Sequence, residues 1–418
     1  MRRGIAFLAV TVALAASGCS GSAEPADSDS GTITWWDTSD ATTEAPTYQA
    51  LVAQFQTQHP KIKVNYVNVP FSDAEQKFKT AAQGGNGAPD VMRSDVGWTP
   101  AFAAQGYLLP LDGTPAVDQI GDFLAGPAGT AKYDGKMYGA PQVTDTLGLL
   151  YNKALFAKAG ITAAPKTWPE LKTAAQALKA KAGVDGVYLN PDSYFLLPFL
   201  FGEGANLVDV ANKKITINSP AAVKGVQTAQ DLVESGAAAK PAYTDGYANM
   251  QAAFKDGKVG MIINGPWSAS DIFAGKAFQD KANLGIAPVP AGSTGQAGSP
   301  VGGHNLVVYA GTKHAGAAEQ FVQFMTSAAS ESTTAAKLGT LPARTSAYTS
   351  EVTANQVIAS FQQAMAIAQP RLALPQASDL LGPLSQDYVK ILQGEQAQAG
   401  LDNSAKEFAK LLPGWSAP

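Results

Sequence analysis

The feature that most constrains this chain is a regular alternation of short β-rich runs with longer helical segments, starting at Thr32. Residues 33–36 and 61–69 predict strands, and the segment 47–59 between them predicts a helix with one apolar face. Residues 88–94 predict another strand after a glycine-rich turn. Strands that alternate with helices in this way favour an α/β architecture with mainly parallel sheets.

Capping residues mark two of the predicted helices. Residues 167–170 form a capping box with a proline in the first turn, and the helix that follows should end at Gly183. Residues 218–220 open a second helix that should end near Gly236. A chain of 418 residues is too long for one compact core, so we expect two domains.

The charge balance excludes several classes of partner and site. Lys plus Arg number 30 against 34 Asp plus Glu, the net charge is −4, and no basic block is longer than two residues. This pattern argues against nucleic acid or an anionic membrane surface as a partner.

The histidines, His59, His304 and His314, lie far apart without carboxylates at ligand spacing, so no metal site is predicted. No phosphate loop, nucleophile elbow or dinucleotide fingerprint is present, and neither a cofactor nor a catalytic residue is predicted.

The amino-terminal segment predicts export. Residues 1–18 hold two arginines, an apolar run from Ile5 to Ala16 and small residues before the single cysteine, Cys19. The run is too short to span a bilayer and resembles a lipoprotein signal peptide that ends at Cys19. Residues 19–31 would then be a lipid-anchored flexible tether on the outer face of the cell membrane. Simple cleavage that leaves a free thiol is the alternative.

Aromatic and acidic residues gather at predicted strand ends and loops, among them Trp35, Trp36 and Asp37. A pyranose presents an apolar C–H face and neighbouring hydroxyl groups, which flat rings and carboxylates recognise. This composition suits a carbohydrate site, although such rings also fill ordinary cores.

Four segments are similar to the extracellular solute-binding proteins of sugar ABC importers, the group of the maltose- and trehalose/maltose-binding proteins. They are ITWWDTSD at 33–40, GAPDVMRSDVGWTPAFAAQGYLLPLD at 87–112, YGAPQVTDTLGLLYNKALFAKAGI at 138–161 and MIINGPWSASDI at 261–272. The resemblance implies an α/β, two-lobed periplasmic-binding-protein fold, each lobe a mainly parallel sheet flanked by helices. It implies an N-terminal lobe of residues 32–143 plus 301–343 and a C-terminal lobe of residues 144–300 plus 344–418. Hinge crossings are expected near 143–146, 296–301 and 343–350.

The same resemblance implies a set of ligand-binding residues, each with a structural alternative in the core or on the surface. Trp267 would stack on a sugar ring, Asp145 would accept hydroxyl protons, and His304 would be a neutral hydrogen-bonding ring. The complete set is Trp267, Asp145, Asp95, Trp98, Tyr194, Phe195, Ser39, Asp40, Gly303, His304 and Arg371. Leu381 stands where related proteins often carry a stacking tryptophan, which leaves the length of the bound glucan open.

The expected protein is a monomeric, lipid-anchored receptor that binds maltose or maltodextrin-type oligosaccharides, closes on them and delivers them to membrane permease subunits. Three alternatives stay open. The first is a secreted glycoside hydrolase of α-glucans that uses two carboxylates such as Asp95 and Asp145. The second is a receptor of the same fold for another sugar, such as trehalose or galactose. The third is a receptor for a charged solute, although an anion is disfavoured because no Arg/Lys cluster is present.

Overall fold

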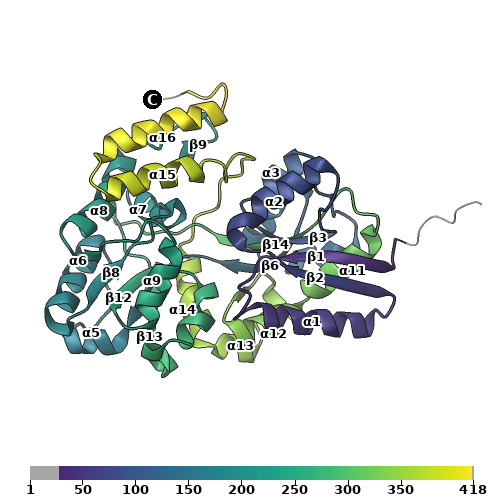
Figure 1. Cartoon of the computed structure of the whole chain (residues 1–418), viewed down its shortest axis with the longest axis horizontal. Coiled ribbons are helices and arrows are strands. Elements are labelled where there is room, and N and C mark those ends of the chain that lie inside the picture. The colour runs from purple at the N-terminus through teal and green to yellow at the C-terminus, as the bar shows by residue number, and fades with distance from the viewer. Residues whose placement is uncertain (1–27, 417–418) are drawn as a thin grey trace, which may run out of the picture.

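Two β-sheets, each flanked by helices, form the two lobes of the molecule (Figure 1). The computed structural model describes residues 28–416. The predicted signal peptide, Cys19 and most of the predicted tether lie outside the described residues. Among residues 28–416, no helix has both the length and the apolar composition needed to cross a membrane.

The N-terminal lobe is built on a six-stranded sheet with the order β15-β6-β14-β3-β1-β2. Its strands are β1 (Gly31–Asp37), β2 (Ile62–Asn68), β3 (Val91–Asp95), β6 (Ala140–Asp145), β14 (Gly302–Val308) and β15 (Leu341–Pro342), and a separate hairpin is formed by β4 (Lys132–Tyr133) and β5 (Lys136–Met137). Its helices are α1 (Ala45–Gln58), α2 (Phe71–Gly84), α3 (Thr99–Ala104), α4 (Ala125–Thr130), α11 (Ala315–Met325) and α12 (Ala328–Leu338).

The C-terminal lobe is built on a five-stranded sheet with the order β11-β8-β12-β7-β13. Its strands are β7 (Gly148–Asn152), β8 (Asp185–Tyr188), β11 (Ala238–Ala239), β12 (Val259–Asn264) and β13 (Leu284–Pro288), and a small hairpin is formed by β9 (Val208–Asp209) and β10 (Lys214–Ile215). Its helices are α5 (Lys153–Ala159), α6 (Trp168–Ala177), α7 (Leu197–Gly202), α8 (Pro220–Glu234), α9 (Gly246–Lys255), α10 (Ala269–Phe273), α14 (Gln356–Met365), α15 (Leu381–Leu392) and α16 (Ala397–Leu411), with α13 (Ser350–Ala354) between α12 and α14.

The two-lobed α/β fold is confirmed, but the expectation of mainly parallel sheets is wrong. Strand β1 pairs in parallel with β2 and β3, whereas β14 runs antiparallel to both β3 and β6. In the second lobe β8 is parallel to β11 and β12, whereas β7 is antiparallel to β12 and β13. Every antiparallel pair of the two sheets includes β6, β7, β13 or β14, the strands that the first two passages between the sheets join.

The chain passes between the sheets at three places. The first passage joins Asp145, the last residue of β6, to Gly148 at the start of β7, and the second joins β13 to β14. The third follows β15 and leads to α14, which packs against β13. The boundary expected after residue 143 cuts β6, since Thr144 and Asp145 still pair with β14. The lobe boundaries as a whole stay a prediction.

Two adjacent tryptophans of β1 lie in the two core layers on opposite faces of the first sheet. Trp35 lies with α1 and α11 residues on one face of the sheet, and Trp36 lies with Phe78 and Phe102 on the other. Successive side chains of a strand point to opposite faces, so a pair of large rings in β1 anchors both layers. Trp35 and Trp36 are therefore core residues, although the sequence placed them among the candidate sugar-binding rings.

The predicted helix caps are present, with one difference. Thr167 Oγ1 accepts a hydrogen bond from Glu170 N at 3.3 Å, as in a capping box. The Glu170 carboxylate, however, accepts from the backbone N–H of Lys166 at 2.7 Å rather than from Thr167. The helix continues through a π-helical turn, Leu178–Ala182, and ends at Gly183 with φ +74°, as expected.

Candidate functional site

Three strands of the first sheet bring two predicted carboxylates and a histidine onto one face. His304 of β14 pairs with Asp95 at the end of β3, and Gly302 pairs with Asp145 at the end of β6. Gly302 and His304 are two residues apart and therefore face the same side of the strand. The register thus places Asp95, Asp145 and His304 together at the edge of the sheet where the chain leaves for the other lobe.

Gly302 leaves room for a contact between the lobes. A Cβ atom at this position would lie 2.0 Å from Asp145 Oδ1 and 2.7 Å from the hydroxyl oxygen of Tyr194. Tyr194 belongs to the 3₁₀ helix Ser193–Leu196 of the C-terminal lobe, where the Asp192 carboxylate caps its backbone N–H at 2.8 Å. The Tyr194 hydroxyl and the Asp145 carboxylate therefore approach each other over a glycine that has no side chain.

Arg371 makes a second contact between the lobes, next to the one between Asp145 and Tyr194. Its Nη2 atom lies 3.8 Å from Asp95 Oδ1, and its guanidinium lies 5.4 Å from the centroid of the Tyr194 ring. Asp95 also accepts a hydrogen bond from Gly97 N at 2.6 Å. Arg371 lies in the segment between α14 and α15, so this contact joins residues that are remote in the sequence.

Aromatic side chains in the C-terminal lobe continue this series of contacts from Tyr194 to Trp267. Trp267 Nε1 donates a hydrogen bond to the Tyr247 hydroxyl at 3.0 Å. The Tyr247 ring lies 6.2 Å from Phe195, which lies 5.8 Å edge-on from Tyr194. A side chain at Gly265 would overlap the Trp267 ring, so glycine is required beneath it. Trp267, Phe195, Tyr194, Arg371 and Asp95 are thus connected by successive contacts, with Tyr247 as a link that sequence reasoning missed.

Trp98 and His304 form a separate ring cluster in the N-terminal lobe. Trp98 is buried, and Phe71 stacks on it with the ring centroids 4.9 Å apart. Phe71 also meets His304 edge-on at 6.0 Å. The ring that solvent reaches is Phe71, 49% exposed, rather than Trp98. Phe71 begins α2 outside the four recognised segments, which explains why it was overlooked.

Ser39, Asp40 and Gly303 have local partners outside this series of contacts. Ser39 Oγ donates to Asp37 Oδ2 at 2.5 Å, and Asp40 accepts from the backbone of Thr42 and Thr43. Gly303 has φ +125°, and a Cβ there would lie 2.2 Å from a backbone oxygen of β6. These contacts give the three residues structural roles, and their part in ligand binding stays a prediction.

Burial is the largest cause of the pKa shifts of Asp145, Asp95 and His304. It raises the pKa of Asp145 to about 8, with the nearby negative charge of Asp95 as the second cause. Burial also raises the pKa of Asp95, against the opposing charge of Arg371. The pKa of His304 falls well below its usual range because burial and then Arg93 disfavour the cation, and neither ring nitrogen has a hydrogen-bond partner within residues 28–416. This direction favours a neutral His304, and its expected hydrogen bonding to a ligand stays a prediction.

Glu44 is a buried carboxyl that sequence reasoning missed. One oxygen accepts from the backbone N–H of Asp40 at 3.0 Å, and the other has no partner among the described residues. Burial raises the Glu44 pKa, and the Glu44 charge acts on Asp145 and also on Tyr247 of the other lobe. Glu44 lies between the strand expected at 33–36 and the helix expected at 47–59, and no role was predicted for it.

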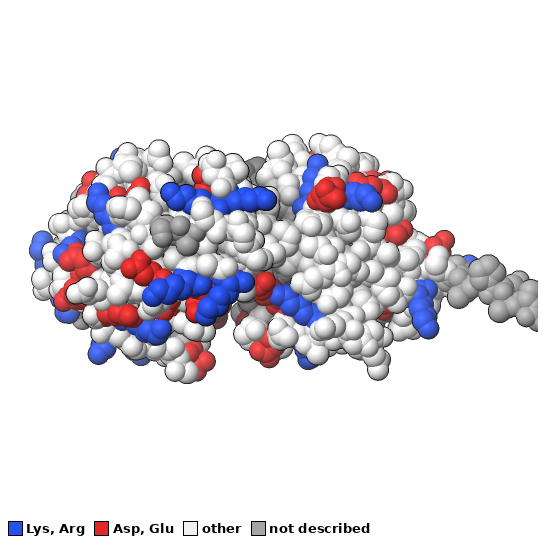
Figure 2. Space-filling view, turned by 90° about the horizontal axis from the view of Figure 1, so that it is seen from above, with Lys and Arg blue, Asp and Glu red and all other residues white. Residues whose placement is uncertain are grey.

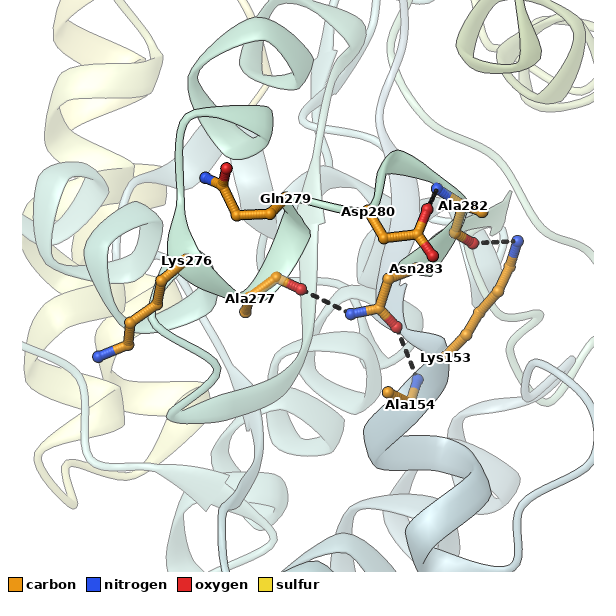
Figure 3. A pocket seen from close by; sticks show the side chains of 8 residues that line it. All are labelled: Lys153, Ala154, Lys276, Ala277, Gln279, Asp280, Ala282 and Asn283. Carbon is orange, nitrogen blue, oxygen red and sulfur yellow. Dashed lines mark hydrogen bonds between the residues drawn. The ribbon is translucent and has the colours of Figure 1, made fainter.

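One small cavity touches Arg371 and none of the other predicted site residues. A cavity of about 30 Å³ beside Arg371 and Leu381 is close to the volume of one water molecule in the liquid. A depression of about 550 Å³ lies elsewhere, on the C-terminal lobe, around Lys153, Lys276 and Asn283 (Figure 3). It contains none of the predicted site residues. Asn283 fills part of it and bridges Ala277 O and Ala154 N, both at 2.7 Å.

The described residues hold no group of three or more His, Cys, Asp or Glu side chains placed to bind a metal ion. On the face seen in Figure 2, acidic and basic side chains are interspersed among uncharged ones. The site is thus an arrangement of rings, carboxyl groups and one guanidinium drawn from both lobes.

Two mixed sheets joined by three chain passages, with this arrangement between them, define a two-lobed solute-binding protein. The sequence profile of the bacterial extracellular solute-binding proteins matches residues 39–332, and the chain belongs to that family. The family resemblance predicted from the four segments is confirmed.

Several known proteins are similar to this chain. The GacH receptor of Streptomyces glaucescens, solved unliganded and in complex with acarbose and an acarbose homolog, is 47% identical, with a TM-score of 0.89 over 93% of this chain and 100% of its own. A maltooligosaccharide ABC transporter solute-binding lipoprotein of Streptococcus pneumoniae is 29% identical over 65% of this chain and 63% of its own. The diacetylchitobiose-binding protein DasA of Streptomyces coelicolor is 28% identical over 71% of this chain and 69% of its own.

Proposed function

We propose that this protein is the substrate-binding component of a sugar ABC importer and that it binds maltose or maltodextrin-type oligosaccharides between its lobes. The observation that carries the proposal is the series of contacts from Trp267 through Phe195, Tyr194 and Arg371 to Asp95, which draws on both lobes. Rings and carboxyl groups together are the chemistry that a neutral pyranose requires.

In this proposal the Trp267 ring stacks on a sugar face, and Asp145 and Glu44 accept hydroxyl protons with oxygens that have no other partner among the described residues. The proteins named for maltooligosaccharides and acarbose among the relatives support an α-glucan-like ligand. Diacetylchitobiose, the ligand in the name of another relative, is the competing sugar class.

The contacts between the lobes couple ligand binding to lobe closure in this proposal. The site residues come from both lobes, so the lobes separate to admit the ligand and close again around it. A ligand that touches both lobes favours the closed form through its differential affinity. The segment before α15 already touches α2 across the lobes, since Lys79 Nζ lies 3.2 Å from Asp379 Oδ1 and Ser378 Oγ donates to Glu75 at 3.0 Å.

We further propose that Cys19 carries the lipid anchor and that the closed form delivers sugar to the permease from the outer face of the membrane. Metabolic labelling with a fatty-acid probe tests the anchor: the wild-type chain should be labelled and the Cys19→Ser variant should not. Labelling of neither chain would contradict it.

Calorimetric titration with maltose, maltotriose, trehalose, galactose and diacetylchitobiose tests the ligand class. We expect heat with maltose or maltotriose and a sugar that is recovered intact. Absence of binding to every sugar would overturn the proposal, and release of glucose from maltotriose would favour the hydrolase alternative.

A further inference from the structure

Asp145 and Glu44 are two buried carboxyl groups without a cationic partner of their own. Asp145 is 7% exposed, and although its backbone pairs with Gly302, its carboxyl group has neither a hydrogen bond nor an ion pair in the described part of the chain. Glu44 is 6% exposed, and one of its oxygens has no partner within residues 28–416. Burying an ionised carboxylate without a partner is costly, so such groups mark places where a ligand supplies what the protein lacks.

The guanidinium groups close to these carboxyls are already engaged. Arg93 donates to Gln142 at 3.0 Å and lies 4.0 Å from Asp37. Arg371 lies 3.8 Å from Asp95. Each guanidinium therefore has a carboxylate other than Asp145 or Glu44 as its nearest acidic partner.

The other titratable groups facing Asp145 supply no positive charge. Tyr194, across Gly302, is neutral because burial and then Asp145 raise its pKa well above the usual range. His304, on the same face of the first sheet, is neutral because burial lowers its pKa. The charged groups that act on Asp145 are two acids, Asp95 and Glu44, and two arginines, Arg93 and Arg371, and each arginine contacts a carboxylate other than Asp145.

A neutral oligosaccharide leaves Asp145 protonated, because it brings no charge that would offset an ionised carboxylate at this buried position. A protonated amine donates stronger, charge-assisted hydrogen bonds and cancels one negative charge. We propose that the preferred ligand of this site is an oligosaccharide that carries one protonated amino group, with Asp145 as its counter-ion. This inference rests on the proposed sugar-binding function and narrows its substrate class.

Calorimetry at pH 6.5 compares maltotriose with three derivatives in which one amino group replaces a 2-, 4- or 6-hydroxyl. At least one derivative should bind tenfold or more tightly than maltotriose, and its N-acetylated form, which has no charge, should lose that advantage. Because Asp145 is protonated in the free protein at this pH and ionised beside the amine, binding should release up to one proton. Titrations in two buffers of different ionisation enthalpy measure that release.

The Asp145→Asn variant should bind maltotriose and its amino derivatives with similar affinity, whereas Asp185→Asn, at an exposed position in β8, should keep the preference. The comparison of ligands on the wild-type chain needs no variant, so it tests the inference even if Asp145→Asn does not fold. Binding of maltotriose with no preference for any amine would overturn the inference alone. Absence of binding to maltotriose and to every derivative would overturn the proposed function as well.

Discussion

Arg371 Nη2 lies 3.8 Å from Asp95 Oδ1 and joins the segment before α15 to the end of β3. Both side chains are largely buried, and the guanidinium also covers the Tyr194 ring. The contact therefore holds a carboxylate, a phenol ring and a cation in one place with side chains from both lobes. Its removal is the most direct test of the proposed site.

Replacing Arg371 by Gln should weaken maltotriose binding about tenfold to a hundredfold, because a charge-assisted contact contributes about 1.5–3 kcal/mol. Calorimetry measures the change. Asp95→Asn and the double variant complete a mutant cycle, in which the two effects should not add. If the effects of the two single variants on the binding free energy add fully, Arg371 and Asp95 act independently in ligand binding.

Replacing Trp267 by Ala should weaken sugar binding by about 1–3 kcal/mol if its ring stacks on the ligand. Tyr247→Phe should have a smaller effect, since it removes the acceptor of the Trp267 N–H but keeps the ring. Trp415, partly buried in the segment that follows α16, provides a matched control whose replacement by Ala should leave the affinity unchanged. Equal affinities for all three variants and the wild type would remove Trp267 from the site.

Gly302→Ala should abolish tight binding, because the new methyl group would lie 2.0 Å from Asp145 Oδ1 and 2.7 Å from the Tyr194 hydroxyl oxygen. The equivalent change at Gly121, where a Cβ would meet no atom within 4 Å, is the matched control and should bind normally. Circular dichroism establishes whether both variants are folded. A folded Gly302→Ala protein with unchanged affinity would contradict the proposed placement of the ligand.

The raised pKa of Asp145 predicts how stability depends on pH. Between about pH 4 and pH 8 the folded protein keeps a proton that the unfolded chain releases, so the free energy of unfolding should fall as the pH rises through this range. Asp145→Asn removes that proton, and its melting temperature relative to the wild type should therefore be higher at pH 8 than at pH 5.

Thermal unfolding at the two pH values measures this effect, with Asp185→Asn as the control for loss of an exposed charge. A melting-temperature difference between Asp145→Asn and the wild type that does not change with pH would show that Asp145 is ionised in the folded protein.

The contact of Lys79 with Asp379 should contribute little to closure. The pair is partly exposed, and such ion pairs contribute about 0.2–1 kcal/mol. Asp379→Asn should therefore change maltotriose affinity by less than about fivefold, and the difference should disappear at high salt. A loss of binding comparable with that of Arg371→Gln would show that closure depends on this surface contact.

Much of the fold follows from local patterns. The strands at 33–36 and 61–69, the capped helix after Thr167 and the helix after Ser219 could be located because each depends on residues close in the sequence. The mixed character of the sheets could not be predicted, since a β-rich run carries no record of the direction in which its neighbour runs.

Some residues of the candidate site could be predicted from local sequence patterns, and others could not. Four segments identified the family and pointed to Asp95, Asp145 and Trp267, which lie within them. Phe71, Tyr247 and Glu44 lie outside the four segments, and the sequence analysis assigned them no role. Their importance depends on which side chains the folded lobes bring next to them, such as Trp98 beside Phe71 and Trp267 beside Tyr247.

The sequence by itself determined the α/β class, the family and the residue types suited to a sugar, because periodicity, capping and motifs are properties of neighbouring residues. Only the tertiary structure decided that Arg371 meets Asp95, that Asp145 faces Tyr194 over Gly302, and that neither Asp145 nor Glu44 forms an ion pair within residues 28–416. Those relationships join elements from distant parts of the chain, and burial and charge at a point in space are set by everything packed around it.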